Sequence, residues 1–295
     1  MSISRFVDAH VHFWQLKRLR YAWLTPPFSD DGPNGNVAPI AQDYLPADYL
    51  RDANGFRVEK LVHIDAGADA SEAIAETRWL QSLADAGGFP QAIVAFAALN
   101  DPDVERTLAA HTESPHVRGI RHILNWHPDP KRTYTPRNLL DDPAFARGYG
   151  LLGKYGLSFD LQIYPNQMPQ AAALAARHPE VPVILNHMGM PVDAERKPWR
   201  DGMKALAALP HAAVKISGMG FIDRAWTMET MAQVILDTID IFRPERCAFA
   251  SDFPTDKLWG SYGKSLAAYD TLTKDFSDDE RDHLFAATAE RIYRI

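Results

Sequence analysis

Eight short runs of apolar and β-branched residues recur along the chain, separated by stretches with helical periodicity and by turn residues. Strands that alternate with helices in this way are typical of βα units, whose strands form a parallel sheet. The predicted strands occupy residues 6–13, 60–66, 92–99, 117–124, 158–164, 181–187, 212–217 and 246–252. The predicted helices occupy residues 70–87, 102–113, 143–155, 167–178, 197–209 and 227–242, and two more follow the last strand. Because a (β/α)₈ TIM barrel typically takes ~250 residues, we expect this α/β fold as a single domain over residues 1–295.

The stretch from residue 14 to 45, between the first two predicted strands, is rich in Pro, Gly, Asn and aromatic residues and has no sustained period. We expect a long loop that distorts one end of the barrel. Loops of this length commonly serve as lids or binding loops, and Trp14, Tyr21, Trp23 and Phe28 would then form an apolar wall beside a binding site. A loop that only packs on the surface fits the same residues, so both interpretations stay open.

The charge of the chain excludes some partners. A formal net charge of −7 argues against nucleic-acid binding, which needs clustered Lys and Arg. No window approaches eighteen apolar residues, so we expect a cytoplasmic protein that does not bind membranes. The single cysteine, Cys247, excludes an internal disulfide and a thiolate metal cluster, and it is expected to be a buried packing residue.

Polar side chains gather at the carboxyl ends of the predicted strands, which is where the active site of such a barrel lies. These residues are His10, His12, His63, Asp65, Arg121, His122, Asp160, Gln162, Tyr164, Asn186, His187, Lys215, Ser217, Ser251 and Asp252. A buried polar group without a partner costs roughly 1–3 kcal/mol. Their convergence on one rim therefore predicts a functional site.

The first predicted strand carries Asp8, His10 and His12 at alternate positions. Successive side chains of a strand point to opposite faces, so we expect these three on one face. Imidazole nitrogens at this spacing can bind one divalent ion or hold one substrate oxygen.

Several rim residues also have a structural interpretation. Asp8 is expected to orient a neighbouring group rather than to react, and His63 can satisfy a buried backbone group. Arg121 can grip a substrate oxygen or close a salt bridge at the rim. Lys215 can face the substrate or pair with an acidic residue inside the barrel.

Five motifs occur in order on the predicted strands: DAHVHFW at 8–14, VRGIRHIL at 117–124, LNHMGMP at 185–191, VKISG at 214–218 and FASDFP at 249–254. In this combination nearly the whole chain resembles the amidohydrolase superfamily. The resemblance is to the amidohydrolase-2 branch of sugar lactonases and 2-pyrone-4,6-dicarboxylate lactonases, which includes L-fuconolactonase-like proteins. It implies that His10, His12 and His187 form the electrophilic side of the site and that Asp252 is the general base or activates water. It also implies that Arg121, His122 and Lys215 face the substrate.

The chain departs from the binuclear members of that superfamily, which use a carbamylated lysine on strand four and a histidine ending strand five. Arg121 and His122 stand at the end of strand four here, and Gln162 and Tyr164 on strand five. A bridged metal pair is therefore not expected. One divalent ion, such as Zn²⁺, held by His10, His12 and Asp252 with or without His187, fits the ligand types. Metal-free catalysis, which the resemblance also allows, is the alternative.

The sequence thus predicts a hydrolase that opens the lactone ring of a small acid from carbohydrate or aromatic catabolism. Its partner would be a small-molecule lactone, and composition does not distinguish a monomer from an oligomer. The candidate catalytic residues are Asp252, His187, His10 and His12, and the candidate substrate-binding residues are Arg121, His122, Tyr164, Lys215 and Asp65. The alternatives are a single-zinc amidohydrolase, an aromatic-acid decarboxylase and, in another class, a non-catalytic barrel that binds a sugar acid.

Overall fold

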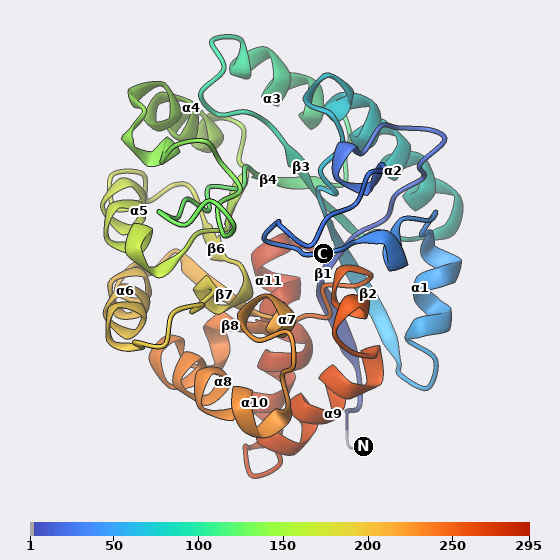
Figure 1. Ribbon diagram of the computed structural model, residues 1–295, viewed down its shortest axis with the longest axis vertical. Helices are drawn as coiled ribbons and strands as arrows, with labels where there is room; N and C mark the ends of the chain where they lie inside the picture. The colour runs from blue at the N-terminus through green and yellow to red at the C-terminus, as the bar shows by residue number, and fades with distance from the viewer. Residues whose placement is uncertain (1–2) are drawn as a thin grey trace.

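The computed structural model describes residues 3–295. Eight parallel strands follow one another around a barrel in sequence order, as predicted (Figure 1). The strands are β1 (Phe6–Val11), β2 (Val58–Ile64), β3 (Ala92–Phe96), β4 (Val117–Arg121), β5 (Ser158–Leu161), β6 (Val183–Leu185), β7 (Ala212–Ile216) and β8 (Cys247–Phe249). The barrel closes just beyond β8, where the amide of Asp252 donates to the His10 carbonyl and the amide of His12 to that of Phe253. The fold is a (β/α)₈ TIM barrel.

Helices surround the strands and bury the outer apolar layer of the barrel. They are α1 (Pro46–Asp52), α2 (Ala73–Gly87), α3 (Val104–Thr112), α4 (Pro143–Lys154), α5 (Met168–Ala175), α6 (Lys197–Ala207), α7 (Met219–Ile222), α8 (Met228–Phe242), α9 (Tyr262–Leu272), α10 (Asp278–Asp282) and α11 (Thr288–Tyr293). The predicted helices are present in these positions, whereas α1 and the short α7 were not predicted. None of the helices formed by residues 3–295 has both the length and the apolar character needed to cross a bilayer.

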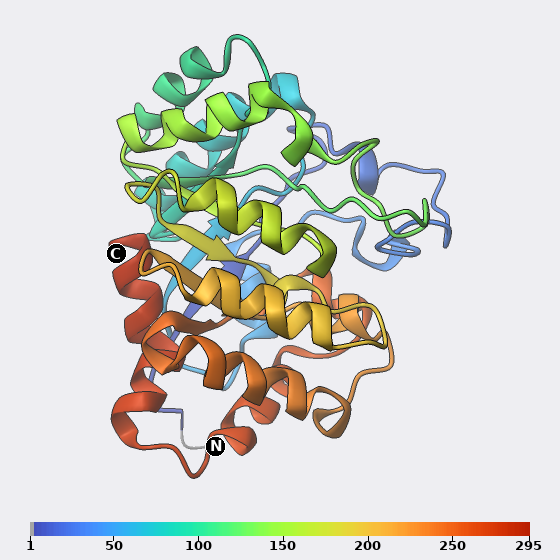
Figure 2. The ribbon, with the colours of Figure 1, turned by 90° about the vertical axis from the view of Figure 1, so that its left-hand side faces the viewer.

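A second apolar cluster joins small residues of the strands, such as Ala9, Ala92 and Ala213, to side chains of α11, including Ile292 and Tyr293. Figure 2 shows α11 and the C-terminus at one end of the barrel, while the loops that follow β1 and β4 project from the other end. The open end, at the carboxyl termini of the strands, is therefore where a ligand can enter.

The first strand contains an irregularity that moves one side chain to the other face. Asp8 pairs with Leu61 but Val11 pairs with His63, so three steps on β1 match two on β2. Such an extra residue is a β-bulge, which shifts the alternation of side chains. The prediction that Asp8 shares a face with His10 and His12 is therefore wrong.

Asp8 instead faces the outer helices. Its carboxylate accepts hydrogen bonds from the hydroxyls of Tyr49 in α1, at 2.8 Å, and Tyr262 in α9, at 3.3 Å. It also accepts from the backbone amides of His10 and Ser251. Burial raises the pKa of Asp8 to about 6. Asp8 thus ties β1 to the end of β8 and to two helices.

Candidate active site

A cavity of about 210 Å³ opens at the carboxyl ends of the strands. Six of the predicted rim residues line it: His12, Asp65, Arg121, Gln162, His187 and Asp252. Its size suits one small ring, since pockets for drug-sized ligands measure roughly 300–1,000 Å³.

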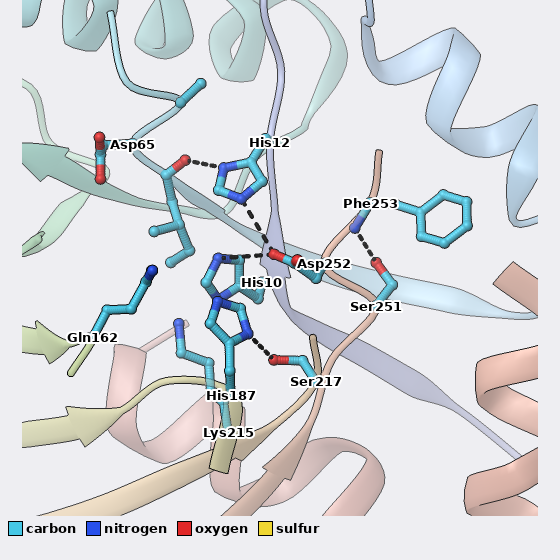
Figure 3. A network of polar contacts seen from close by, with 12 residues as sticks. His10, His12, Asp65, Gln162, His187, Lys215, Ser217, Ser251, Asp252 and Phe253 are labelled. Atoms are coloured by element: carbon cyan, nitrogen blue, oxygen red, sulfur yellow. Dashed lines mark hydrogen bonds and ion pairs between the residues drawn. The ribbon is translucent and has the colours of Figure 1, made fainter. Parts of the chain in front are cut away.

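The imidazole of His12 has a defined protonation pattern. Its Nδ1 atom lies 2.8 Å from the carbonyl oxygen of Ile64. Because a carbonyl oxygen only accepts, Nδ1 carries the proton and Nε2 presents a lone pair. That lone pair faces Asp252 Oδ1 at 3.3 Å (Figure 3). When the ring is neutral, two acceptor atoms thus face each other across a short gap.

His10 lies beside this pair, fully buried. Its Nε2 atom is 3.3 Å from the same Asp252 oxygen, and its ring centroid is 4.9 Å from that of His12. Among residues 3–295, neither ring nitrogen of His10 nor Oδ2 of Asp252 has a hydrogen-bond partner. Burial, with the nearby Lys215 charge as the next cause, holds the pKa of His10 well below its ordinary value. His10 is therefore neutral at pH 7.

These groups fit a divalent cation. One ligand atom each from His10, His12 and Asp252 lies within 4.8 Å of the others, all three residues being buried. Two imidazole nitrogens and a carboxylate oxygen are ligands that Zn²⁺ accepts. A cation between them would satisfy the facing acceptors and one of the unpartnered ring nitrogens of His10. They are the three residues predicted from the sequence as a metal set.

His187 completes the cluster from the end of β6. Its ring centroid lies 4.7 Å from that of His10, and its Nδ1 shares a hydrogen bond of 2.9 Å with Ser217 Oγ. Burial lowers the pKa of His187 to about 3, so this imidazole is neutral as well. A Cβ at Gly218 would lie 2.4 Å from His187 Nδ1, so the ring can occupy this place only because residue 218 is glycine.

The backbone is strained at two of these residues. His187 and Asp252 have φ angles of 52° and 58°, in the left-handed region that non-glycine residues rarely adopt. Such conformations cost of order 1–3 kcal/mol each and cluster at functional sites. Both side chains leave their strands through these turns to face the cavity.

Arg121 lies in the cavity wall, but its guanidinium already donates hydrogen bonds to other residues of the protein. Its Nε and Nη2 atoms donate to the side chain and the carbonyl oxygen of Asp65, each at 2.5 Å. Its Nη1 atom donates to Gln162 Oε1 at 3.0 Å. Of the two interpretations of Arg121, the structure thus shows the salt bridge at the rim, and this salt bridge forms part of the cavity wall.

Lys215 lies deeper in the barrel and does not line the cavity. Its ammonium is 2.5 Å from Asp160 Oδ1, both side chains being fully buried. Burial lowers the pKa of Lys215 to about 8, against the opposing effect of Asp160. The hydroxyl of Tyr293, from α11, donates to the same Asp160 oxygen at 2.8 Å.

Two further candidate substrate-binding residues, besides Lys215, lie outside the cavity lining. His122 packs between Phe96 and Phe145, and its Nδ1 accepts from the amide of Leu99 at 3.2 Å. Tyr164 donates to the carbonyl of Arg132 at 2.5 Å and lines a neighbouring cavity. His63 accepts from the amide of Phe13, in agreement with its structural interpretation.

The outer wall of the cavity comes from loops. Of the four aromatic residues of the loop after β1 that could form an apolar wall, Trp23 lines the cavity, and its indole nitrogen donates to the Ala66 carbonyl at 2.8 Å, whereas Trp14, Tyr21 and Phe28 do not line it. The sequence did not single out Asn34, Ile123, Tyr134, Phe221 and Thr255, which also line the cavity. The aperiodic stretch between β4 and α4 was the available signal for Tyr134, whose hydroxyl donates to Asn34 Oδ1 at 2.6 Å.

Comparisons of the sequence and the fold with known proteins identify relatives that agree with one another. Residues 7–295 match the Amidohydrolase family. An uncharacterised protein of Sinorhizobium fredii is 39% identical over 298 residues, covering 100% of both chains. The L-fucono-1,5-lactonase of Burkholderia multivorans is 29% identical over 307 residues, covering 98% of this chain and 96% of that protein.

A crystal structure of an amidohydrolase from Burkholderia multivorans with bound zinc superimposes with a TM-score of 0.82 at 27% identity. The match covers 99% of this chain and 100% of that one. Family, fold and buried residue cluster agree with one another. The chain belongs to the amidohydrolase family, in its lactonase-like branch, and is a hydrolase.

Proposed function

We propose that the protein hydrolyses the lactone ring of a small sugar acid or related carboxylic acid. The observation that carries this proposal is the buried carboxylate of Asp252, which lies 3.3 Å from the His10 and His12 imidazoles and lines, with His12 and His187, a cavity sized for one small ring. The likeness to L-fucono-1,5-lactonases over nearly the whole chain supports it.

We propose that Asp252 acts as the general base. Its unpartnered Oδ2 atom accepts a proton from water as that water attacks the lactone carbonyl. The same carboxyl then returns the proton to the ring oxygen as the carbon–oxygen bond breaks. In protein without a bound cation, the lone pair on His12 Nε2, fixed by the Ile64 contact, can accept the other water proton as a hydrogen bond.

His187 is the candidate donor to the developing oxyanion. When the Ser217 hydroxyl donates to Nδ1 of His187, the proton of the neutral ring resides on Nε2. An N–H group in a buried site stabilises an oxyanion strongly, and losing one such donor typically costs about 10²–10³ in kcat.

We further propose that His10, His12 and Asp252 bind one divalent cation. Bound there, it would supply Lewis-acid polarisation of the carbonyl and a more acidic water. The crystal structure of the related amidohydrolase with bound zinc supports the presence of a metal ion.

The test is hydrolysis of a panel of sugar-acid 1,4- and 1,5-lactones, followed with a pH indicator, by wild type and by Asp252→Asn. Asn tolerates a left-handed backbone, so this variant removes the base and leaves the φ of 58° accessible. We expect kcat to fall roughly 10²–10⁴-fold.

Asp8→Asn is the matched control, because Asp8 is an equally buried carboxylate of the same barrel outside the cavity. Asn Oδ1 can keep the amide bonds of His10 and Ser251, and its NH₂ group can donate to the Tyr49 and Tyr262 hydroxyls. A kcat that falls equally in both variants would refute the role of Asp252. No hydrolysis of any lactone by wild type would refute the proposed function.

A further inference from the structure

The charges around the cavity narrow the substrate class of the proposed lactonase. We propose that the substrate is an uncharged lactone, one that carries no carboxylate on its remote ring substituents. This inference rests on the proposed function. It follows from the partners of the cationic side chains at the site.

Arg121 is the cation in the cavity wall that a substrate carboxylate would need. Its guanidinium and the Asp65 carboxylate are about 5% and 2% exposed, and the two lie 2.5 Å apart. Each of its three nitrogens already donates to a protein oxygen. Asp65 therefore balances the charge of Arg121 before any ligand binds, and the two N–H groups of Arg121 that remain could donate hydrogen bonds to a substrate but would offer it no net positive charge.

The positive charge of Lys215 is also balanced by a carboxylate of the protein. It pairs with Asp160 below the cavity and donates to the Ala9 carbonyl at 3.3 Å, out of contact with the cavity surface. Among the described residues that line the cavity, the remaining charged side chain is Asp252, which is anionic as a base. An anionic substrate would thus meet repulsion without a compensating cation.

A cation bound by His10, His12 and Asp252 would balance the charge of Asp252, but it would not supply a positive charge at the outer wall. It would act at the reacting carbonyl, whereas a remote carboxylate would face the outer wall. Trp23, Ile123 and Phe221 form the apolar part of that wall, and Asn34, Tyr134 and Thr255 supply uncharged polar groups. Such a wall suits hydroxyl, methylene and methyl substituents.

The cations nearest to the outer wall belong to the neighbouring cavity. Lys131 pairs with Asp31 at 2.9 Å and Arg132 with Asp193 at 2.7 Å. Arg224 donates to the Gly32 carbonyl at 3.3 Å. Carboxylates thus balance the charges of Lys131 and Arg132, and Arg224 lines the neighbouring cavity but not the cavity of the candidate site.

The first test compares lactones of one configuration that differ only at the remote carbon. In D-galactono-1,4-lactone and D-galactaro-1,4-lactone, and in the corresponding gluco and manno pairs, that carbon is CH₂OH or a carboxylate. We expect wild type to prefer the uncharged member by roughly 100-fold or more in kcat/KM, in both chelator-treated and zinc-supplemented protein.

The second test is Asp65→Asn, which removes the counter-ion of Arg121 and frees the guanidinium for a substrate carboxylate. The ratio of kcat/KM should shift at least about tenfold toward the carboxylate-bearing lactone. Asp129→Asn is the matched control, since it removes one negative charge from the neighbouring cavity and leaves Arg121 paired. Its ratio should stay that of wild type.

Equal rates on both members of a pair, or preference for the carboxylate, would overturn the inference and leave the lactonase proposal standing. An equal shift in Asp65→Asn and Asp129→Asn would overturn the assignment to Arg121. Hydrolysis of neither member of any pair would overturn the lactonase proposal and the inference with it. The wild-type comparison decides the substrate class even if Asp65→Asn does not fold.

Discussion

At the scale of single residues, one hydrogen bond sets the chemistry of the cluster. The Ile64 carbonyl fixes the proton of His12 on Nδ1 and leaves the Nε2 lone pair toward Asp252. Backbone contacts that fix a tautomer in this way are common behind metal-binding histidines. Without a cation between them, the two facing acceptor atoms repel each other in the folded protein. A bound cation would remove this repulsion, so metal binding should stabilise the fold.

Zinc should therefore raise the melting temperature of the wild-type protein and have little effect on Asp252→Asn. A ligand at 100 times its dissociation constant stabilises a protein by ~2.7 kcal/mol, and the variant lacks the only anionic ligand of the set. Thermal denaturation of chelator-treated protein with added Zn²⁺ measures this. His122→Asn, which changes a largely buried imidazole outside the cluster, should keep the wild-type shift. The same shift in Asp252→Asn would show that zinc binds elsewhere.

At the scale of elements, α11 closes the end of the barrel opposite to the cavity (Figure 2), and its Tyr293 side chain contacts Asp160 inside the barrel. Tyr293 donates to Asp160, and Lys215 lies 5.5 Å from the centroid of the Tyr293 ring. The buried ion pair under the imidazole cluster thus depends on the last helix of the chain. A hydrogen bond to a charged group contributes roughly 1.5–3 kcal/mol.

Tyr293→Phe should lower the free energy of unfolding by about that amount, because it removes only the hydroxyl and leaves Asp160 less satisfied. Tyr269→Phe is the matched control, since this equally buried hydroxyl donates to the neutral carbonyls of Ile216 and Ala250. Its loss should cost about 0.5–1.5 kcal/mol. Urea denaturation of the two variants measures the difference. Equal losses would show that Tyr293 does not support the ion pair.

At the scale of the whole molecule, the strand order and the polar rim could be predicted because both are local patterns. The predicted strand 181–187 extended beyond β6, which ends at Leu185, since the sequence pattern continues where the backbone turns left-handed at His187. The face of Asp8 could not be predicted, because a bulge shows only in the pairing of β1 with β2. The partner of Arg121 could not be predicted either, because Asp65 is 56 residues away in the chain.

The stability of the whole molecule should depend on pH through its buried imidazoles, and His122 allows this to be tested away from the site. Burial lowers its pKa from 6.5 to about 4, and protonation would place a second donor against the Leu99 amide. Below pH 6.5 the unfolded chain binds this proton and the folded chain does not, so stability is lost as the pH falls toward 4. The loss from one such group approaches ~1.4 kcal/mol per pH unit.

His122→Asn keeps an acceptor for the Leu99 amide and does not titrate. Urea denaturation at pH 7.5 and 5.5 should show that the variant loses about 1 kcal/mol less than wild type between these values. At pH 7.5 both forms of the side chain are neutral, so the two proteins should be of similar stability there. An identical loss in both proteins would mean that His122 is protonated as readily in the folded chain as in the unfolded one. In that case the contact between its Nδ1 and the Leu99 amide would not restrain its titration.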